Sequence, residues 1–256
     1  MAVSDVQRGR HFVRSLERGL AVIRALGGAP PMAVSEIAER TGMTRAAARR
    51  FVLTLEELGY VTVQDGRYSL APQTLELGYA YLSSLSLPER AEPYLRELVD
   101  EVHESSSVSV LDGADVVYVA RVAAGRIMTV RIDVGTRFPA YATSMGRVLL
   151  AGLAEPERDA LLRGVTLERL TPATITSAAK LKAELAKVAA QGYAIVDQEL
   201  EQGLCSVAVP IRDGSGAVVA AVNLSTHVSR TAASEVPQVL LPPLIRTAQR
   251  IERDLR

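Results

Sequence analysis

The sequence predicts an α+β protein of two domains: a small helical domain with one β-hairpin, followed by a larger domain built on one antiparallel sheet. In the first third of the chain, apolar residues recur at helical spacing, and an Asp-Gly pair separates two short β-rich runs. After Ser105, β-rich runs form two clusters with helical runs between them. We expect the first domain to span 1–72, a linker helix 73–87 and the second domain 88–256.

Three helices are predicted in the first domain. Residues 1–11 are polar and are expected to form an arm, and apolar residues at helical spacing from Phe12 predict a first helix that ends near Gly27. A short second helix is expected over 35–41. Thr44 is placed to cap a third helix, because its hydroxyl can accept from a free backbone N–H of the first turn.

The segments that join and follow these helices are a tight turn and a hairpin. Gly42 accepts the positive φ that a close change of direction demands, and Gly59 stands where the third helix should end. The two β-rich runs that follow are joined by Asp65-Gly66, a strong hairpin signal. Helix, turn, helix and hairpin in this order are typical of a winged helix-turn-helix.

The third helix separates a basic face from an apolar face. At about 100° per residue, its apolar residues share one side and are expected in the core: Ala47, Ala48, Phe51, Val52, Leu55 and Leu58. Arginines on the opposite side suit double-stranded DNA, because arginine contacts phosphate and bonds guanine bidentately. The residues that we expect to contact an operator are Ser35, Thr44, Arg45, Ala46, Arg49, Arg50 and Arg67.

A plainer interpretation is that the arginines only solvate an exposed face. For a lone basic helix we would prefer that interpretation. Here the turn and the hairpin accompany the helix in register, and this context favours DNA binding. The 29 basic and 29 acidic residues balance, so the chain is no general nucleic-acid coater, and affinity for DNA must come from local placement.

The composition excludes several classes of protein. Apolar residues make up 48% of the chain, so we expect a sizeable core and little disorder. Cys205 is the only cysteine, which excludes an intramolecular disulfide and a cysteine-based zinc site. The chain has neither a signal-peptide pattern nor a long apolar run, so we expect a cytoplasmic protein with no membrane partner, associated with the nucleoid through DNA.

After the hairpin, an apolar stripe with few charges predicts the linker helix, in which Leu75, Tyr79, Leu82 and Leu85 share a face. We expect it to pair with its copy in a homodimer, because operators are usually read by dimers. Pro88 opens the second domain with a helix to Val102. Further strands are expected at 108–111, 116–122, 128–134, 193–197, 206–211 and 218–226, and helices at 144–153, 156–162, 177–191 and 244–255.

Segments spread over nearly the whole chain carry a family resemblance. They are Val13-Arg14-Ser15-Leu16-Glu17-Arg18-Gly19-Leu20, Ser35-Glu36-Ile37-Ala38, Leu55-Glu56-Glu57-Leu58-Gly59-Tyr60, Tyr141-Ala142-Thr143-Ser144-Met145-Gly146-Arg147, Asp197-Gln198-Glu199 and Gly203-Leu204. Together they resemble the IclR family of bacterial transcriptional regulators. The third helix departs from the commoner Ser-Thr-containing version. It looks instead like the subgroup that controls catabolism of aromatic acids through the β-ketoadipate route.

The resemblance implies a winged helix-turn-helix, a linker helix used in dimerisation and a C-terminal effector domain related to the GAF fold. Family members are dimers that often pair again into tetramers, and they sense small carboxylates. Some repress and others activate, and an activator would also meet RNA polymerase. Protocatechuate, 4-hydroxybenzoate and β-ketoadipate are all open as effectors, and an aliphatic acid such as glyoxylate or pyruvate is the alternative. No cofactor is expected.

A helix N-terminus in the second domain can hold a carboxylate, because its free N–H groups need no counter-charge. The segment that leads into this helix lines the effector pocket in the family; its residues here are Tyr141, Ala142, Thr143, Ser144, Met145 and Gly146. The plainer interpretation is that Thr143 or Ser144 is an ordinary helix cap.

Other candidates for the effector site lie on strands. Asp197 has a family counterpart that faces the pocket, although it also suits a turn. By two-residue alternation, Asn223 and Ser225 share one face of the last strand. An inward Arg121 or Arg131 would clamp a carboxylate, although strand arginines more often face solvent. Cys205 is expected beside the pocket or in the core.

Three alternatives to an effector-controlled regulator have less support in the sequence. Cys205, His227 and Asp197 are the best available set for a thiol enzyme, but no local motif supports them, so no catalytic residue is predicted. Three scattered histidines and one cysteine show no metal-ligand spacing, so no metal site is expected. A DNA binder without a ligand would leave the whole second domain without a role.

Overall fold

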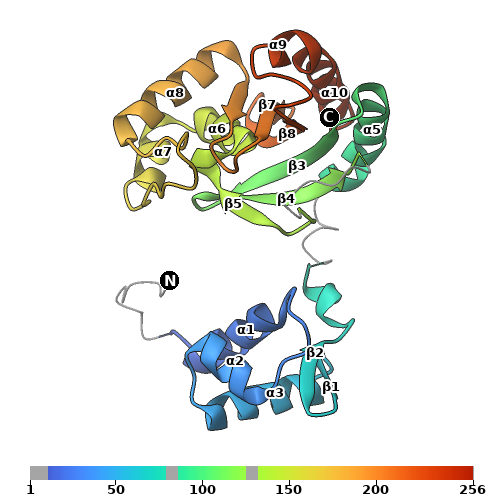
Figure 1. Ribbon diagram of the computed structural model, residues 1–256, viewed down its shortest axis with the longest axis vertical. Coiled ribbons are helices and arrows are strands. Elements are labelled where there is room, and N and C mark those ends of the chain that lie inside the picture. Colours follow the sequence, from blue (N-terminus) through green and yellow to red (C-terminus); the bar gives the residue numbers. More distant parts are fainter. Residues whose placement is uncertain (1–10, 79–85, 125–131, 256) are drawn as a thin grey trace. The chain divides into compact units, whose positions relative to one another are not determined.

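The computed structural model describes residues 11–78, 86–124 and 132–255 (Figure 1). The chain divides into two compact units, Met1–Ser84 and Leu85–Arg256, which we describe separately. The predicted fold class is confirmed: a helix-turn-helix unit comes first, and an α+β unit with one curled antiparallel sheet follows. In the described part of the chain, no helix is both long and apolar enough to cross a membrane.

The first unit contains three helices and a two-stranded hairpin. Their bounds are α1 Arg14–Leu26, α2 Val34–Thr41, α3 Arg45–Glu57, β1 Val61–Gln64 and β2 Arg67–Leu70. The turn between α2 and α3 depends on Gly42, whose φ is +66°, and the Oγ1 of Thr44 accepts from the amide of Ala47 at 3.3 Å. Asp65 and Gly66, both with positive φ, close the hairpin as the sequence predicts. Of the expected linker helix, 73 lies in a turn, 74–78 are helical, 79–85 lie outside the described residues, and 86–87 begin the next helix.

The core of the first unit is smaller than the apolar pattern suggests. Val22, Ile37 and Val52 are fully buried between the three helices. Leu58, expected in this core, is instead 56% exposed. It is the C-cap residue of α3, and the chain reverses at Gly59 with a φ of +82°, so Leu58 lies beyond the packed face of the helix.

The second unit is a six-stranded antiparallel sheet covered by helices on both faces (Figure 1). The strand order is β5-β4-β3-β8-β7-β6, with β3 Ser105–Asp112, β4 Asp115–Val122, β5 Arg137–Pro139, β6 Ala194–Asp197, β7 Leu204–Arg212 and β8 Val218–His227. The helices are α5 Ser86–Val102, η1 Ala140–Ala142, α6 Ser144–Gly152, α7 Glu155–Leu162, α8 Ala178–Gln191, α9 Val236–Val239 and α10 Leu241–Asp254. Helices α5 and α10 pack together on one face, and α6 crosses the other face with α8 against it.

One predicted strand is wrong in the part that the structure describes. Residues 125–131 lie outside the described residues, and Ile132 to Val134 are not in a strand. The neighbour of β4 is instead the short β5, in which Phe138 pairs with Val116. A turn at Gly135, with a φ of +89°, separates the β-rich run from β5, so β propensity alone misplaces the edge strand.

Gly146 marks the closest approach between η1 and α6. A Cβ atom on Gly146 would lie 2.2 Å from the carbonyl oxygen of Ala140 and 2.3 Å from its Cα. Both neighbours belong to the backbone, so no side-chain rotation could relieve the clash. Glycine at this position therefore lets η1 pack directly on the first turn of α6.

We expect Gly146→Ala to destabilise the second unit by about 3 kcal/mol, because the added methyl group must displace backbone. Gly164→Ala is the matched control, since a Cβ there meets nothing within 4 Å, and it should change stability by about 0.5 kcal/mol at most. Urea denaturation monitored by circular dichroism measures both. Equal midpoints for the two variants would contradict the packing described here.

Candidate functional site

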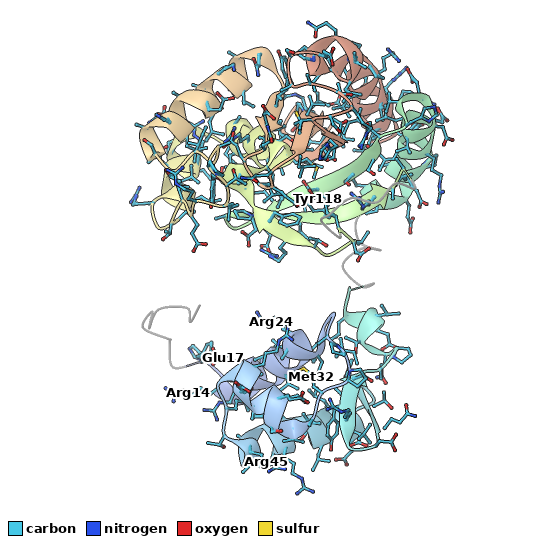
Figure 2. The ribbon with its side chains drawn as sticks, in the orientation of Figure 1. Arg14, Glu17, Arg24, Met32, Arg45 and Tyr118 are labelled. Atoms are coloured by element: carbon cyan, nitrogen blue, oxygen red, sulfur yellow. The ribbon has the colours of Figure 1, made fainter. Side chains whose placement is uncertain are left out.

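The exposed face of α3 is basic. Arg45, Arg49 and Arg50 are exposed, as are the cap residue Thr44 and Ala46 in the first turn. Figure 2 shows Arg45 extending away from the first unit. None of the three guanidinium groups makes an ion pair with another described residue. These donors are therefore available to a ligand, and the small side chain of Ala46 leaves the helix backbone accessible between them.

Two other residues expected at DNA lie on neighbouring elements. Ser35 is exposed in the first turn of α2. Arg67, on β2, donates from Nη1 to the carbonyl oxygen of Pro31 at 2.8 Å and to Oε2 of Glu36 at 3.2 Å. The same Glu36 oxygen accepts from the amide of Ala33 at 2.6 Å, at the start of α2. Arg67 thus ties the hairpin to α2, a contact that sequence reasoning missed.

A pocket opens on the α6 face of the second unit's sheet. It is narrow, with a cavity volume of about 10 Å³, which is room for roughly one water molecule, so a larger ligand must displace lining side chains. Among the described residues, its lining contains hydroxyl, amide and apolar groups and no charged side chain. The lining residues are Tyr118, Ile132, Ala142, Thr143, Ser144, Met145, Val196, Leu200, Leu204, Ser206, Asn223 and Ser225.

The N-terminus of α6 forms one wall of this pocket. Thr143 is the cap residue, and its Oγ1 accepts from the amide of Gly146 at 3.0 Å. The amides of Ser144 and Met145 have no acceptor inside the helix and no other partner among the described residues. Thr143 is thus an ordinary cap, as in the plainer interpretation. The two amides next to it lie at the positive end of the helix dipole, where an anion is favoured, and carboxylate binding there stays a prediction.

The strand wall of the pocket holds an amide and two hydroxyl groups. Asn223 and Ser225 share the pocket face of β8, as alternation predicts, and Nδ2 of Asn223 donates to Oγ of Ser225 at 3.0 Å. Oδ1 of Asn223 accepts from the amide of Ser107 on β3 at 3.0 Å. Ser206, which the sequence did not single out, pairs with Ser225 across β7 and β8 and joins the same wall.

Arg121 lies on the pocket face of the sheet, although it does not line the pocket itself. Ser109 pairs with Tyr118 and Val108 pairs with Ala120, so the ladder has an irregularity at Val119. This extra residue turns Tyr118 and Arg121 to the same face. Burial lowers the pKa of Arg121, and burial raises the pKa of Tyr118 to about 12.

The guanidinium of Arg121 donates to Oγ of Ser107 at 3.2 Å, next to the Asn223 wall. It thus places a positive charge beside an uncharged pocket. Arg131, the other strand arginine considered, lies outside the described residues.

Two expected pocket residues point away from the pocket. Asp197 and Cys205 pair across β6 and β7, and their strand neighbours Val196 and Leu204 are the ones that line it. Cys205 is fully buried, and burial, with a smaller contribution from Asp197, raises the pKa of its thiol to about 11. His227 pairs with Leu204 and therefore faces the opposite side from Cys205. These three residues cannot form a thiol-based catalytic set, because the thiol stays protonated at neutral pH and the histidine lies on the other face.

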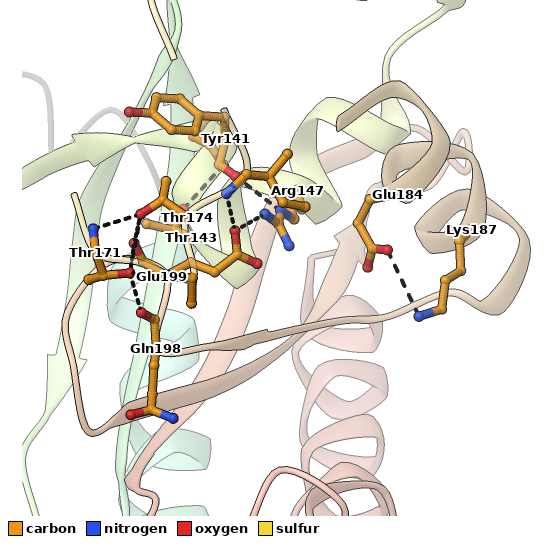
Figure 3. A network of polar contacts seen from close by, with 12 residues as sticks. Tyr141, Thr143, Arg147, Thr171, Thr174, Glu184, Lys187, Gln198 and Glu199 are labelled. Carbon is orange, nitrogen blue, oxygen red and sulfur yellow. Dashed lines mark hydrogen bonds and ion pairs between the residues drawn. The ribbon is translucent and has the colours of Figure 1, made fainter. Parts of the chain in front are cut away.

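A buried polar network supports the pocket from behind (Figure 3). Arg147 on α6 is 1% exposed; its Nη2 donates to Oε2 of Glu199 at 2.6 Å and its Nε to the carbonyl oxygen of Tyr141 at 3.0 Å. Glu199 also accepts from the amide of Ile175 at 2.9 Å. The hydroxyl of Tyr141 donates to the carbonyl oxygen of Glu168 at 2.9 Å.

Tyr141 and Gly146, both expected to bind ligand, therefore shape the pocket without lining it. Tyr141 holds the side chain of Arg147, and Gly146 packs on Ala140. Sequence reasoning noted Arg147 and Glu199 only as family motif residues. A signal was available for Arg147, which stands in an otherwise apolar run, because buried charges are found paired. Glu199 lies among polar residues and gives no such signal. No group of acidic, histidine or cysteine residues that could hold a metal occurs in the described ranges.

Comparisons with known proteins cover both units of the chain. A family model for the IclR helix-turn-helix domain matches residues 15–65, and one for the bacterial transcriptional regulator IclR C-terminal domain matches 79–253. The Pca regulon regulatory protein of Pseudomonas putida is 46% identical over 236 residues, which cover 91% of this chain and 81% of that protein.

Solved structures of similar fold are also regulators of transcription or IclR homologues. A crystal structure from Rhodococcus sp. RHA1, described as a regulator of transcription, is 56% identical with a TM-score of 0.84, and the match covers 95% of this chain and 98% of that one. An IclR homologue of Microbacterium hydrocarbonoxydans, complexed with 4-hydroxybenzoate, is 26% identical with a TM-score of 0.82, over 94% of this chain and 99% of that one. The chain belongs to the IclR family of bacterial transcriptional regulators.

Proposed function

We propose that this transcriptional regulator reads a double-stranded operator with α3 and is controlled by a small aromatic carboxylate in the α6 pocket. The observation that carries the proposal is the pocket itself, where two free helix amides face an otherwise uncharged, largely apolar lining. The Pseudomonas putida relative is named as a Pca regulon regulator, and the Microbacterium homologue binds 4-hydroxybenzoate. These two relatives favour an acid of the 4-hydroxybenzoate or protocatechuate type.

The carboxylate is proposed to accept from the amides of Ser144 and Met145, with the positive charge of Arg121 near the pocket. An aromatic ring then contacts Tyr118 and the apolar residues of the lining. Hydroxyl groups on the ring face the strand wall, where Ser225 can donate or accept. An aliphatic acid such as pyruvate would use the same amides but would leave the apolar lining unfilled.

We expect the regulator to act as a homodimer. The outer side of α1 exposes large apolar side chains, which in a soluble monomer would be costly to leave together in water; they are Phe12, Val13, Leu16 and Leu20. Leu75 and Leu77, in the short helical segment that follows the hairpin, are exposed as well. A two-fold dimer built on these surfaces would present two copies of α3 to two half-sites, one helical turn of DNA apart or a multiple of it. Pairing of dimers into tetramers and contact with RNA polymerase are compatible with this arrangement.

Effector control is proposed to be a two-state process. Binding in the pocket biases the relative pose of the paired DNA-binding units through the linker segment that begins with the helical residues 74–78. A coupling free energy of about 1–3 kcal/mol is enough to change operator occupancy severalfold. No refolding of either unit is required.

Arg49→Ala should weaken operator binding about tenfold or more, because it removes a groove-facing guanidinium group, and it should reduce the salt dependence of binding. Fluorescence anisotropy with operator DNA at several salt concentrations measures both quantities. Arg253→Ala, which removes an exposed arginine from α10, is the control and should bind as wild type does. Wild-type affinity of the Arg49 variant at every salt concentration would refute this docking of α3.

A thermal-shift screen of the purified protein distinguishes aromatic from aliphatic effectors. At about 100 times its Kd, a ligand stabilises the folded protein by about 2.7 kcal/mol, which raises Tm by several degrees. We expect 4-hydroxybenzoate or protocatechuate to raise Tm, and glyoxylate and pyruvate to leave it unchanged. A shift with the aliphatic acids alone would keep the carboxylate site and reject the aromatic assignment.

Ser144→Arg should abolish the effector response and leave operator binding intact, because the long side chain fills the pocket in the second unit while α3 lies in the first. Ser215→Arg, in the exposed turn between β7 and β8, is the matched control. Anisotropy with and without 4-hydroxybenzoate reports the response. An effector response that survived in a folded Ser144 variant would place the site elsewhere.

A further inference from the structure

A second cavity lies between α7 and α8 in the second unit. Its volume is about 210 Å³, and it shares no lining residue with the effector pocket. Most of its wall is apolar. The lining residues are Arg158, Asp159, Leu162, Arg163, Val165, Leu167, Ala178, Leu181, Lys182 and Leu185.

Arg158 is the unusual member of this wall. The residue is only 9% exposed, and its Nε is buried without a hydrogen-bond partner. Among the described residues it is the one side chain with such an atom. A buried donor that finds no acceptor destabilises a fold, and most buried polar groups are satisfied by protein, water or ligand. The apolar helices around Arg158 thus hold a guanidinium group that lacks an acceptor at its Nε.

The other charges of the cavity do not satisfy Arg158. Lys182 Nζ contacts Glu155 Oε1 at 2.8 Å and Asp159 Oδ2 at 3.3 Å, so both acids are already paired across α7 and α8. Arg163 is exposed at the rim. The cavity therefore combines an apolar wall, the ion pairs of Lys182 with Glu155 and Asp159, and the buried guanidinium group of Arg158.

We propose that this cavity is a second small-molecule site, which binds a monocarboxylate with an apolar alkyl or aryl body. One edge of a guanidinium group, Nε with Nη, matches the two oxygens of a carboxylate. The Nε of Arg158 lacks a partner but is covered by its neighbours, so a carboxylate in the cavity reaches it only when the side chain shifts. Leu162, Leu167 and Leu181 provide the surface for the apolar body. The wall also carries Arg163 and Lys182 against a single acid, Asp159, so charge alone does not exclude other anions; the apolar residues are what favour a monocarboxylate with an apolar body.

Titration calorimetry of the full-length protein with octanoate and with benzoate tests this inference. Each titration is run with and without saturating 4-hydroxybenzoate, which competes at the effector pocket. We expect binding that 4-hydroxybenzoate does not displace and that Arg158→Met weakens at least about tenfold, since a charge-assisted bidentate contact is lost. Inorganic phosphate should not bind at this position.

A second variant guards against a folding defect in Arg158→Met. Ala178→Phe, at the exposed start of α8, narrows the cavity without touching a buried group and should weaken the same binding. Arg253→Met, the same change at an arginine outside the cavity, should leave it unaltered.

Three results would overturn the inference. The first is that neither probe binds wild type at millimolar concentration. The second is that both cavity variants bind the probes as tightly as wild type does. The third is that 4-hydroxybenzoate displaces the probes completely. If only water bonds to Arg158, neither probe binds wild type, which is the first of these results. If 4-hydroxybenzoate itself does not bind, the proposed effector fails, but the effects of the two cavity variants still decide on the second site.

Discussion

The buried ion pair between Arg147 and Glu199 is the constraint on which the second unit's site depends. The two charges lie 52 residues apart in sequence and meet at 2.6 Å in the core. Removing two charges from water is costly, so such a pair adds little net stability, whereas removing one partner leaves a buried charge and costs about 3–5 kcal/mol. The main effect of the pair is therefore to determine which segments pack together; its net contribution to the free energy of folding is small. Here it requires α6 to lie against the segment that follows β6.

The ion pair therefore holds two walls of the pocket, α6 and the segment after β6, at a fixed distance from each other. Arg147 also binds the carbonyl oxygen of Tyr141, just before the free amides of Ser144 and Met145. Glu199 accepts from Ile175 and is flanked by Leu200, which lines the opposite side of the pocket. A carboxylate bound as proposed would meet amides that are already oriented. This accounts for an arginine in the pocket motif that does not itself line the pocket.

Turn and cap residues predicted the elements of the first unit. In the second unit, the sequence did not predict which sheet face several strand residues occupy. Gly42, Thr44 and Asp65-Gly66 each determine a turn or cap within a few residues, so helix-turn-helix and hairpin follow from the sequence. The face of a strand residue depends on register and on irregularities, which are set by partner strands. The extra residue at Val119 turns Arg121 toward the pocket face, and the pairing of β6 with β7 turns Asp197 and Cys205 away from it. Burial of Arg147 could be suspected from its apolar neighbours, but Glu199 stands in the polar run 197–202, so its role as the partner could not be recognised without the fold.

The α6 pocket and the cavity beside Arg158 both border one packed cluster of side chains. Leu181 and Leu185 line the cavity beside Arg158 and also belong to the buried cluster that contains Met145 of the effector pocket. A densely packed cluster transmits a displacement on one side to the other, because it has few voids to absorb it. If α8 has two positions against α6, any ligand that prefers one position changes the affinity of a ligand in the other cavity, and the effect is reciprocal. A molecule bound between α7 and α8 would then modulate the effector response without competing for the effector's own site.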